Sequence, residues 1–312
     1  MSPRRNHLAF VAILAMTAAW GSTFFMIKDV VTRIPVTDLL AVRFAIASLV
    51  LVLVAFRQLR MSAATLARGV GLGLLYGVAQ ILQTVGLSHT AASVSGFITG
   101  LYVVATPLLA ALIFRVRVSA VTWIAVGLAT GGLGVLSLQG FALGYGELLT
   151  LGAAIIYAGH IIAMGRWSTP ETTMSLTVVQ MVVIALVCTV GALIGPGDWR
   201  IQLPGSGGDW LVIVYLAVVA GALTMFLQTW AQARIEPTRA AVVMSMEPVW
   251  AAAFAVALGG ERISWRMLLG GLAILTAMYL VELAPRRSLR AAEATLEAAD
   301  DLTATPERPH SP

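Results

Sequence analysis

The chain has 312 residues, of which 59% are hydrophobic and only 11% are charged, and its mean hydropathy is +0.88. Soluble globular domains contain about 45–50% apolar and about 25% charged residues, so this composition argues against a water-soluble fold. The net charge of +5 comes from basic residues that lie singly or in pairs between apolar runs. This pattern is typical of membrane orientation and not of a nucleic-acid-binding surface.

Ten apolar runs follow one another along the chain, each close to the roughly 20 residues that a membrane-spanning helix needs. The predicted spans cover residues 8–27, 37–56, 68–87, 91–114, 119–138, 145–164, 174–195, 210–230, 238–258 and 264–284. The first run resembles a signal peptide, but it is longer than the usual apolar core and lacks an Ala-x-Ala cleavage site, so we expect a retained helix. The predicted fold class is an all-α integral membrane protein of about ten transmembrane helices.

The segment after the last span differs from the rest. Residues 285–312 open with basic residues and continue with acidic residues, Ala and Pro. Such a segment cannot bury enough apolar surface to fold alone, so we expect a disordered cytoplasmic tail. Cys188 is the only cysteine, which excludes an internal disulfide and a cysteine-based metal cluster. No cofactor and no metal is expected.

The distribution of basic residues predicts the orientation. Of the 20 Lys and Arg residues, fourteen fall on the side of the two termini, five fall on the opposite side, and Arg43 lies within a span. Because Lys and Arg accumulate in cytoplasmic loops, this bias predicts a multi-pass cell (inner) membrane protein with both termini in the cytoplasm.

The chain repeats itself after about 140 residues. Gln83 and Gln228 are each followed by Thr near the end of a span, and Pro107 and Pro248 each lie within the next span. A serine follows an aliphatic residue at the start of the fifth and tenth spans. These matches indicate a duplication.

Each predicted unit, residues 8–138 and 145–284, contains five spans. Because five is odd, the second unit must enter the membrane in the opposite orientation. The sequence therefore predicts two inverted repeats, a construction that many secondary transporters use around a central site.

Together these features resemble the ten-helix EamA-type exporters of the drug/metabolite transporter superfamily, over about residues 8–284. The residues that carry the resemblance are Trp20-Gly21, Arg43-Phe44, Pro107, Glu247-Pro248 and Gly260-Glu261-Arg262. The resemblance implies efflux of amino-acid-like or nucleobase-like metabolites or of amphipathic drugs. One departure is that Thr106 stands where the second repeat has Glu247, so a symmetric acidic pair is not expected.

Polar groups within the spans are candidates for the site, because burying a charge in the bilayer costs about 2.5–3.5 kcal/mol on insertion scales. Glu247 lies near the middle of its span, and it is predicted to exchange protons or bind a cation. The alternative is a structural acid beside the ladder gap that a mid-helix Pro248 leaves. A desolvated carboxyl there could couple efflux to a proton gradient.

Two basic side chains have competing interpretations. Arg43 could hold a substrate carboxylate, but an ion pair with Asp38 or Glu247 that stabilises the bundle is favoured. His160 could relay protons, although a lone histidine is more often a hydrogen-bonded core residue.

Polar aromatic and amide side chains recur on several spans and could line a metabolite cavity, which needs an apolar wall with a few donors and acceptors. The alternatives are the aromatic belt at the membrane surface and hydrogen bonds between helices. The predicted substrate-binding residues are Trp20, Arg43, Tyr76, Gln80, Tyr102, Tyr157, His160, Gln228 and Trp250, with Glu247 as the proton-coupling residue.

The sequence thus predicts a secondary transporter, and specifically a proton-coupled or gradient-driven exporter. No ATP-binding motif is present, so the energy must come from a gradient. Facilitated import or exchange is the first alternative. A polytopic membrane enzyme is a weaker one, because the four histidines are dispersed and no paired catalytic constellation is visible. The expected partners are a small-molecule substrate and the lipid bilayer, with a homodimer as a further expectation and no nucleic acid.

Overall fold

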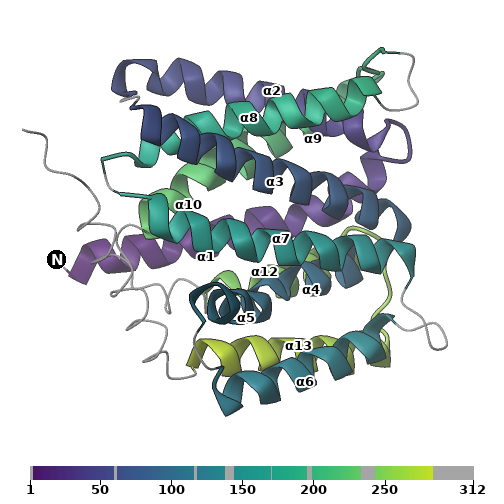
Figure 1. The fold of residues 1–312 in the computed structure, drawn as a ribbon. Helices are drawn as coiled ribbons and strands as arrows, with labels where there is room; N and C mark the ends of the chain where they lie inside the picture. The colour runs from purple at the N-terminus through teal and green to yellow at the C-terminus, as the bar shows by residue number, and fades with distance from the viewer. Residues whose placement is uncertain are drawn as a thin grey trace, which may run out of the picture.

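The computed structural model describes residues 3–59, 62–115, 118–137, 144–169, 171–194, 199–232 and 243–283, and every regular element in these ranges is a helix. The predicted tail, residues 285–312, lies outside them. In Figure 1 the helices run side by side in one bundle, with the N-terminal end of α1 projecting at the left. The all-α fold class is confirmed.

The first half of the chain contains α1 (Pro3–Val30), α2 (Val36–Ala55), η1 (Phe56–Gln58), α3 (Ala63–His89), α4 (Ala92–Gly100), α5 (Tyr102–Phe114) and α6 (Ala120–Ser137). The second half contains α7 (Tyr145–Trp167), α8 (Thr173–Ile194), α9 (Gly207–Val214), η2 (Tyr215–Leu223), α10 (Thr224–Gln232), α12 (Glu247–Ala257) and α13 (Trp265–Leu283). Within the described ranges, seven segments are long and apolar enough to cross a membrane, and three shorter apolar helices, α6, α12 and α13, complete ten.

Three predicted spans are not single regular helices. The fourth divides at Leu101 into α4 and α5. The eighth contains α9, the π-helical segment η2 and α10, so its middle has the wider turn that is rare in proteins and frequent at functional sites. In the ninth, residues 233–242 lie outside the described ranges, and α12 begins only at Glu247 after a turn.

The start of α12 corrects one prediction. Pro248 was expected in the middle of a helix, where it would free a backbone carbonyl one turn earlier. It lies instead in the first turn of α12, where a missing N–H breaks no intrahelical bond. Pro107 does lie inside a helix, α5.

The helices of the two halves contact one another in the same pattern when the halves are exchanged. The contact of α3 with α7 corresponds to that of α10 with α1. The contact of α1 with α12 corresponds to that of α7 with α4 and α5. The pairs α2–α8, α6–α13 and α4–α12 each join corresponding helices of the two halves (Figure 1). Since each half contains five spans, an odd number, the two five-helix repeats are inverted relative to one another.

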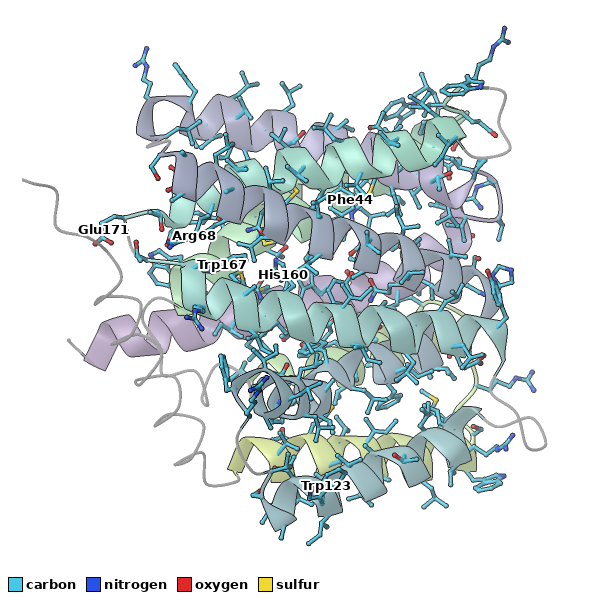
Figure 2. The ribbon with its side chains drawn as sticks, viewed as in Figure 1. Phe44, Arg68, Trp123, His160, Trp167 and Glu171 are labelled. Atoms are coloured by element: carbon cyan, nitrogen blue, oxygen red, sulfur yellow. The ribbon has the colours of Figure 1, made fainter. Side chains whose placement is uncertain are left out.

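The outer surface of the bundle is apolar. Trp123 on α6 is 60% exposed and points away from the bundle, whereas Phe44 is buried between α2 and α8 (Figure 2). Arg68 and Glu171 lie at one end of the bundle (Figure 2). Apolar sides with charged ends are what a multi-pass membrane protein presents to lipid and water.

Candidate functional site

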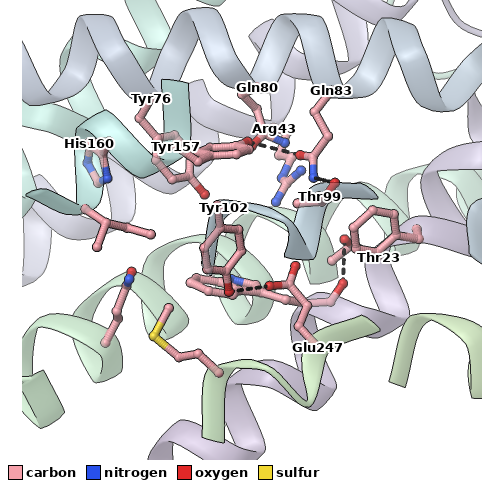
Figure 3. Close-up of a pocket in the computed structure, with 15 residues that line it drawn as sticks. Thr23, Arg43, Tyr76, Gln80, Gln83, Thr99, Tyr102, Tyr157, His160 and Glu247 are labelled. Carbon is pink, nitrogen blue, oxygen red and sulfur yellow. Dashed lines mark hydrogen bonds between the residues drawn. The ribbon is translucent and has the colours of Figure 1, made fainter. Parts of the chain in front are cut away.

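A cavity lies at the centre of the bundle, between the two repeats. Its volume is about 60 Å³, enough for roughly four waters at about 15 Å³ each. Nine of the ten predicted site residues line it, namely Trp20, Arg43, Tyr76, Gln80, Tyr102, Tyr157, His160, Gln228 and Glu247. Figure 3 shows most of them pointing into the same space.

Six further residues of the lining were not among the predicted site residues. They are Thr23, Phe24, Gln83, Thr99, Ile161 and Met244. Thr23 and Phe24 follow Trp20 by about one helical turn, so helical periodicity from Trp20 could have identified them. Gln83 both lines the cavity and joins helices, through its hydrogen bonds with Tyr157 and Thr99.

The cavity lies where two spans are interrupted. α5 begins at Tyr102 and α12 begins at Glu247, and the two side chains meet: the Tyr102 hydroxyl donates to Glu247 Oε2 at 3.3 Å (Figure 3). The cavity therefore lies where α4 gives way to α5 and where α12 begins.

Glu247 is 6% exposed. Within the described residues it forms no ion pair, and Tyr102 provides its hydrogen bond. The titratable and charged side chains that share the cavity with it are Arg43, Tyr76, Tyr157 and His160, besides Tyr102. The carboxyl is therefore an acid inside the bundle whose charge is not neutralised by a fixed partner.

The expected ion pair of Arg43 is wrong. Among the described residues the guanidinium pairs with neither Asp38 nor Glu247, and Asp38 instead accepts a hydrogen bond from the backbone N–H of Gln202 at 2.8 Å. Arg43 Nε donates to the carbonyl oxygen of Leu216 at 3.1 Å, and its guanidinium carbon lies 4.9 Å from the centre of the Phe44 ring. Nη1 is buried and has no hydrogen-bond partner in the described part of the chain.

The π-helical segment η2 supplies the acceptors that hold two cavity side chains. Arg43 uses the carbonyl of Leu216, and Trp20 Nε1 donates to the carbonyl of Ala220 at 3.2 Å and to Thr224 Oγ1 at 2.9 Å. A π turn pairs each carbonyl with the N–H five residues ahead, and such turns are frequent at functional sites. η2 thereby fixes one charged and one aromatic group from the first repeat.

A hydrogen-bonded chain crosses the opposite wall of the cavity. The Tyr157 hydroxyl lies 2.6 Å from Gln80 Oε1 and 3.0 Å from Gln83 Oε1, and Gln83 Nε2 donates to Thr99 Oγ1 at 3.0 Å (Figure 3). This chain joins α7 of the second repeat to α3 and α4 of the first. The amide and phenol groups on this wall are therefore oriented before any solute binds.

His160 is a hydrogen-bonded residue at the edge of the cavity. Its Nε2 lies 3.0 Å from Gln180 Oε1, and its ring lies edge-on to Tyr76 with centroids 5.2 Å apart. Gln180 itself does not belong to the lining. Gln228 faces the cavity from α10, and its Oε1 is buried without a partner in the described residues.

Trp250 is the predicted site residue that lies outside the lining. Its ring stacks on Phe254, with centroids 6.1 Å apart, and its backbone lies against Gly21 of α1. A side chain at position 21 would overlap the backbone of α12, so glycine is required for the close approach of α1 and α12.

The helical fold and the central cavity agree with the class of protein that the family comparison gives. Residues 7–138 and 144–283 each match the EamA-like transporter family, and the chain therefore belongs to this family of multi-pass membrane transporters.

Individual relatives agree with this class. The chain is 28% identical over 277 residues to an uncharacterized transporter of Archaeoglobus fulgidus, covering 88% of this chain and 84% of that protein. It is 25% identical over 262 residues to the uncharacterized inner membrane transporter YedA of Escherichia coli strain K12, covering 82% and 84%. A solved crystal structure shares the fold with a TM-score of 0.63 at 17% identity, over 94% of this chain and 98% of that one.

Proposed function

We propose that this transporter exports a small zwitterionic, amino-acid-like solute in exchange for protons. The observation that carries the proposal is the presence of one cation, Arg43, and one acid, Glu247, in the same central cavity without an ion pair between them. A solute with a carboxylate and an ammonium group offers each of them a partner of opposite charge.

The hydrogen-bonding capacity left on the cavity wall supports this substrate class. Arg43 Nη1 is a donor without a partner and Gln228 Oε1 is an acceptor without one, within the described residues. An unsatisfied buried polar group costs about 1–3 kcal/mol, so a ligand that satisfies both groups gains by binding. A guanidinium donates in a planar fork that matches a carboxylate.

Glu247 provides the coupling. A protonated carboxyl has no charge to offer an ammonium group, whereas an ionised one does, so proton and substrate compete for the same oxygen atoms. Binding the solute releases a proton, and binding a proton displaces the solute. This competition couples efflux to a proton gradient in the direction that brings protons into the cell, with both termini in the cytoplasm as the basic residues indicate.

The test is counterflow in proteoliposomes that are loaded with unlabelled amino acids, one compound at a time. A zwitterion should exchange against its labelled form, whereas the corresponding amine and the corresponding carboxylic acid should not. The solute should be recovered unchanged, which separates transport from catalysis. Equal exchange of the zwitterion and of its des-carboxy analogue would contradict the assignment of Arg43.

A further inference from the structure

The turn between α3 and α4 is held by charged side chains from three other elements. It lies at the distal face, by which we mean the end of the bundle opposite the N-terminal end of α1. Lys28 Nζ of α1 donates to the carbonyls of Leu87 and Ser88, each at 3.0 Å. The Thr90 hydroxyl donates to Glu147 of α7 at 2.7 Å.

Glu261 makes the third contact, from the loop between α12 and α13. Its Oε1 accepts from the backbone N–H of Ala92 at 2.7 Å and of Ser93 at 3.4 Å, and its other oxygen accepts from the Ser93 hydroxyl. α4 has no side-chain cap of its own at Ala91. A carboxylate of the second repeat therefore caps an N-terminus of the first, where anions are stabilised.

The loop is shaped to present this carboxylate. Gly260 has a φ of +74°, a backbone conformation that favours glycine, and it follows the end of α12. The next N–H, that of Glu261, returns to the carbonyl of Ala255 at 3.0 Å. The chain thus folds back on α12 and directs Glu261 to the start of α4.

Next to this contact lies a group of buried apolar side chains. We call this group the distal plug and define it as Phe24, Ile27, Leu87 and Ala92, which are all at most 3% exposed and belong to one cluster. On α1, the distance from Phe24 in the cavity lining to Lys28 is about 6 Å at 1.5 Å per residue. The plug is therefore about one helical turn thick.

α4 connects the contact with Glu261 to the cavity. It is nine residues long, it is separated from α5 by the break at Leu101, and it ends next to Thr99 and Tyr102 of the lining. Its neighbour across the repeat interface is α12, whose Ala251 and Pro248 lie against Gly96 and Gly100. Small residues let α4 lie close to α12 at these two positions, whereas Phe97 of α4 packs against Gly271 of α13.

We propose that Glu261 holds the distal face closed by capping α4, and that α4 moves when the cavity opens on this face. While Glu261 caps α4, the distal plug is closed and the cavity has no exit on this face. When α4 moves away from the α12–α13 loop, its N-terminal N–H groups lose their acceptor and the plug separates. Glu261 is a positioning residue, since it acts on the path and does not contact the solute.

The test uses accessibility and needs no substrate, so its result is independent of the proposed solute and of proton coupling. Ser95 lies in α4 one turn from Thr99, is fully buried, and its hydroxyl has no hydrogen-bond partner in the described residues. We would replace Cys188 by serine, introduce Ser95→Cys, and measure the labelling rate with a membrane-impermeant maleimide in right-side-out and inside-out vesicles. A separate Arg262→Cys protein identifies the vesicles in which the distal face is accessible.

In those vesicles Glu261→Ala should raise the labelling rate of the cysteine at 95 by about twofold to thirtyfold, the range expected for loss of a helix cap. Glu261→Gln and Ser93→Ala should each give a smaller increase, and they replace Glu261→Ala as the test if that protein does not fold. Arg262→Gln, which changes an exposed neighbour in the same loop, should leave the rate unchanged. Folded variants at 261 and 93 with the parental rate would overturn the proposal, as would an equal increase from Arg262→Gln.

Discussion

Replacing Glu247 by glutamine tests the coupling most directly. Glu247 is the only acid among the described residues that line the cavity, so one proton is expected per transport cycle. A gradient of one pH unit corresponds to about 1.4 kcal/mol per proton and supports up to about tenfold accumulation of a solute. Glu247→Gln removes both the titrating group and the charged partner of the ammonium group, so the accumulation should fall to onefold, and the exchange that remains without a gradient should have a raised KM and no pH dependence.

The structure predicts that this variant folds. Glu247 has no ion pair within the described residues, so the substitution leaves no buried cation without its counter-charge. Glutamine retains an oxygen that can accept from the Tyr102 hydroxyl. We expect a change of about 1 kcal/mol in the free energy of unfolding, the usual contribution of one hydrogen bond.

The assay is accumulation of the solute identified by counterflow, in proteoliposomes with an imposed pH gradient of known size. Glu171→Gln is the matched control, because Glu171 lies in the exposed connection between α7 and α8 and not in the cavity. It should retain gradient-driven accumulation. A folded Glu247→Gln protein that still accumulates solute tenfold per pH unit would refute the role of Glu247.

Four further predictions address the cavity and the bundle. Arg43→Lys should raise KM by about tenfold or more in exchange assays, since an ammonium group cannot reproduce the fork of a guanidinium; an unchanged KM would remove the carboxylate contact. Exchange of one proton for a neutral zwitterion moves one charge across the membrane. A membrane potential of 100 mV, imposed with potassium and valinomycin, is worth about 2.3 kcal/mol per charge and should therefore change the accumulation ratio by up to about fiftyfold. Electroneutral transport would contradict that stoichiometry. Gly21→Val should destabilise the protein by about 1–3 kcal/mol because of overpacking, which a shift in thermal unfolding would report. A reporter active only outside the cytoplasm should be active in the 199–206 loop and silent after Arg290; the reverse pattern would invert the proposed orientation.

The helical class and the inverted arrangement could be predicted from the sequence because they depend on the length of the apolar runs and on the number of runs in each repeat. Runs of about 20 apolar residues are governed by bilayer thickness, and an odd number of spans per repeat requires inversion. The polar side chains of the spans were also good candidates for the cavity lining, since a polar group facing lipid is costly. Trp250 shows the weakness of that argument, because an indole can also pack between helices.

The interruptions of the spans could not be predicted. Hydropathy measures burial and not backbone pairing, so the break at Leu101 and the π-helical turns of η2 leave no apolar or charged signal in the sequence. The position of Pro248 could not be predicted either, because a proline can lie inside a kinked helix or in the first turn of a helix. The predicted partner of Arg43 was wrong because its partner is a backbone carbonyl, that of Leu216, which hydropathy and side-chain chemistry do not reveal.

The exchange symmetry of the packing has a consequence for the resting equilibrium of the transporter. In an inverted repeat, the conformation open to the other side is obtained by letting the two halves adopt each other's arrangement. The counterpart of the loop that carries Glu261 is then the connection between the fourth and fifth spans, which reads Arg-Val-Arg at residues 115–117 and contains no acid. The first repeat therefore has no carboxylate at the position that corresponds to Glu261. We expect the empty protein to populate the state with the distal face closed more than the state with the opposite face closed. Binding of solute or proton must then supply the difference in free energy before the cavity opens to the distal side.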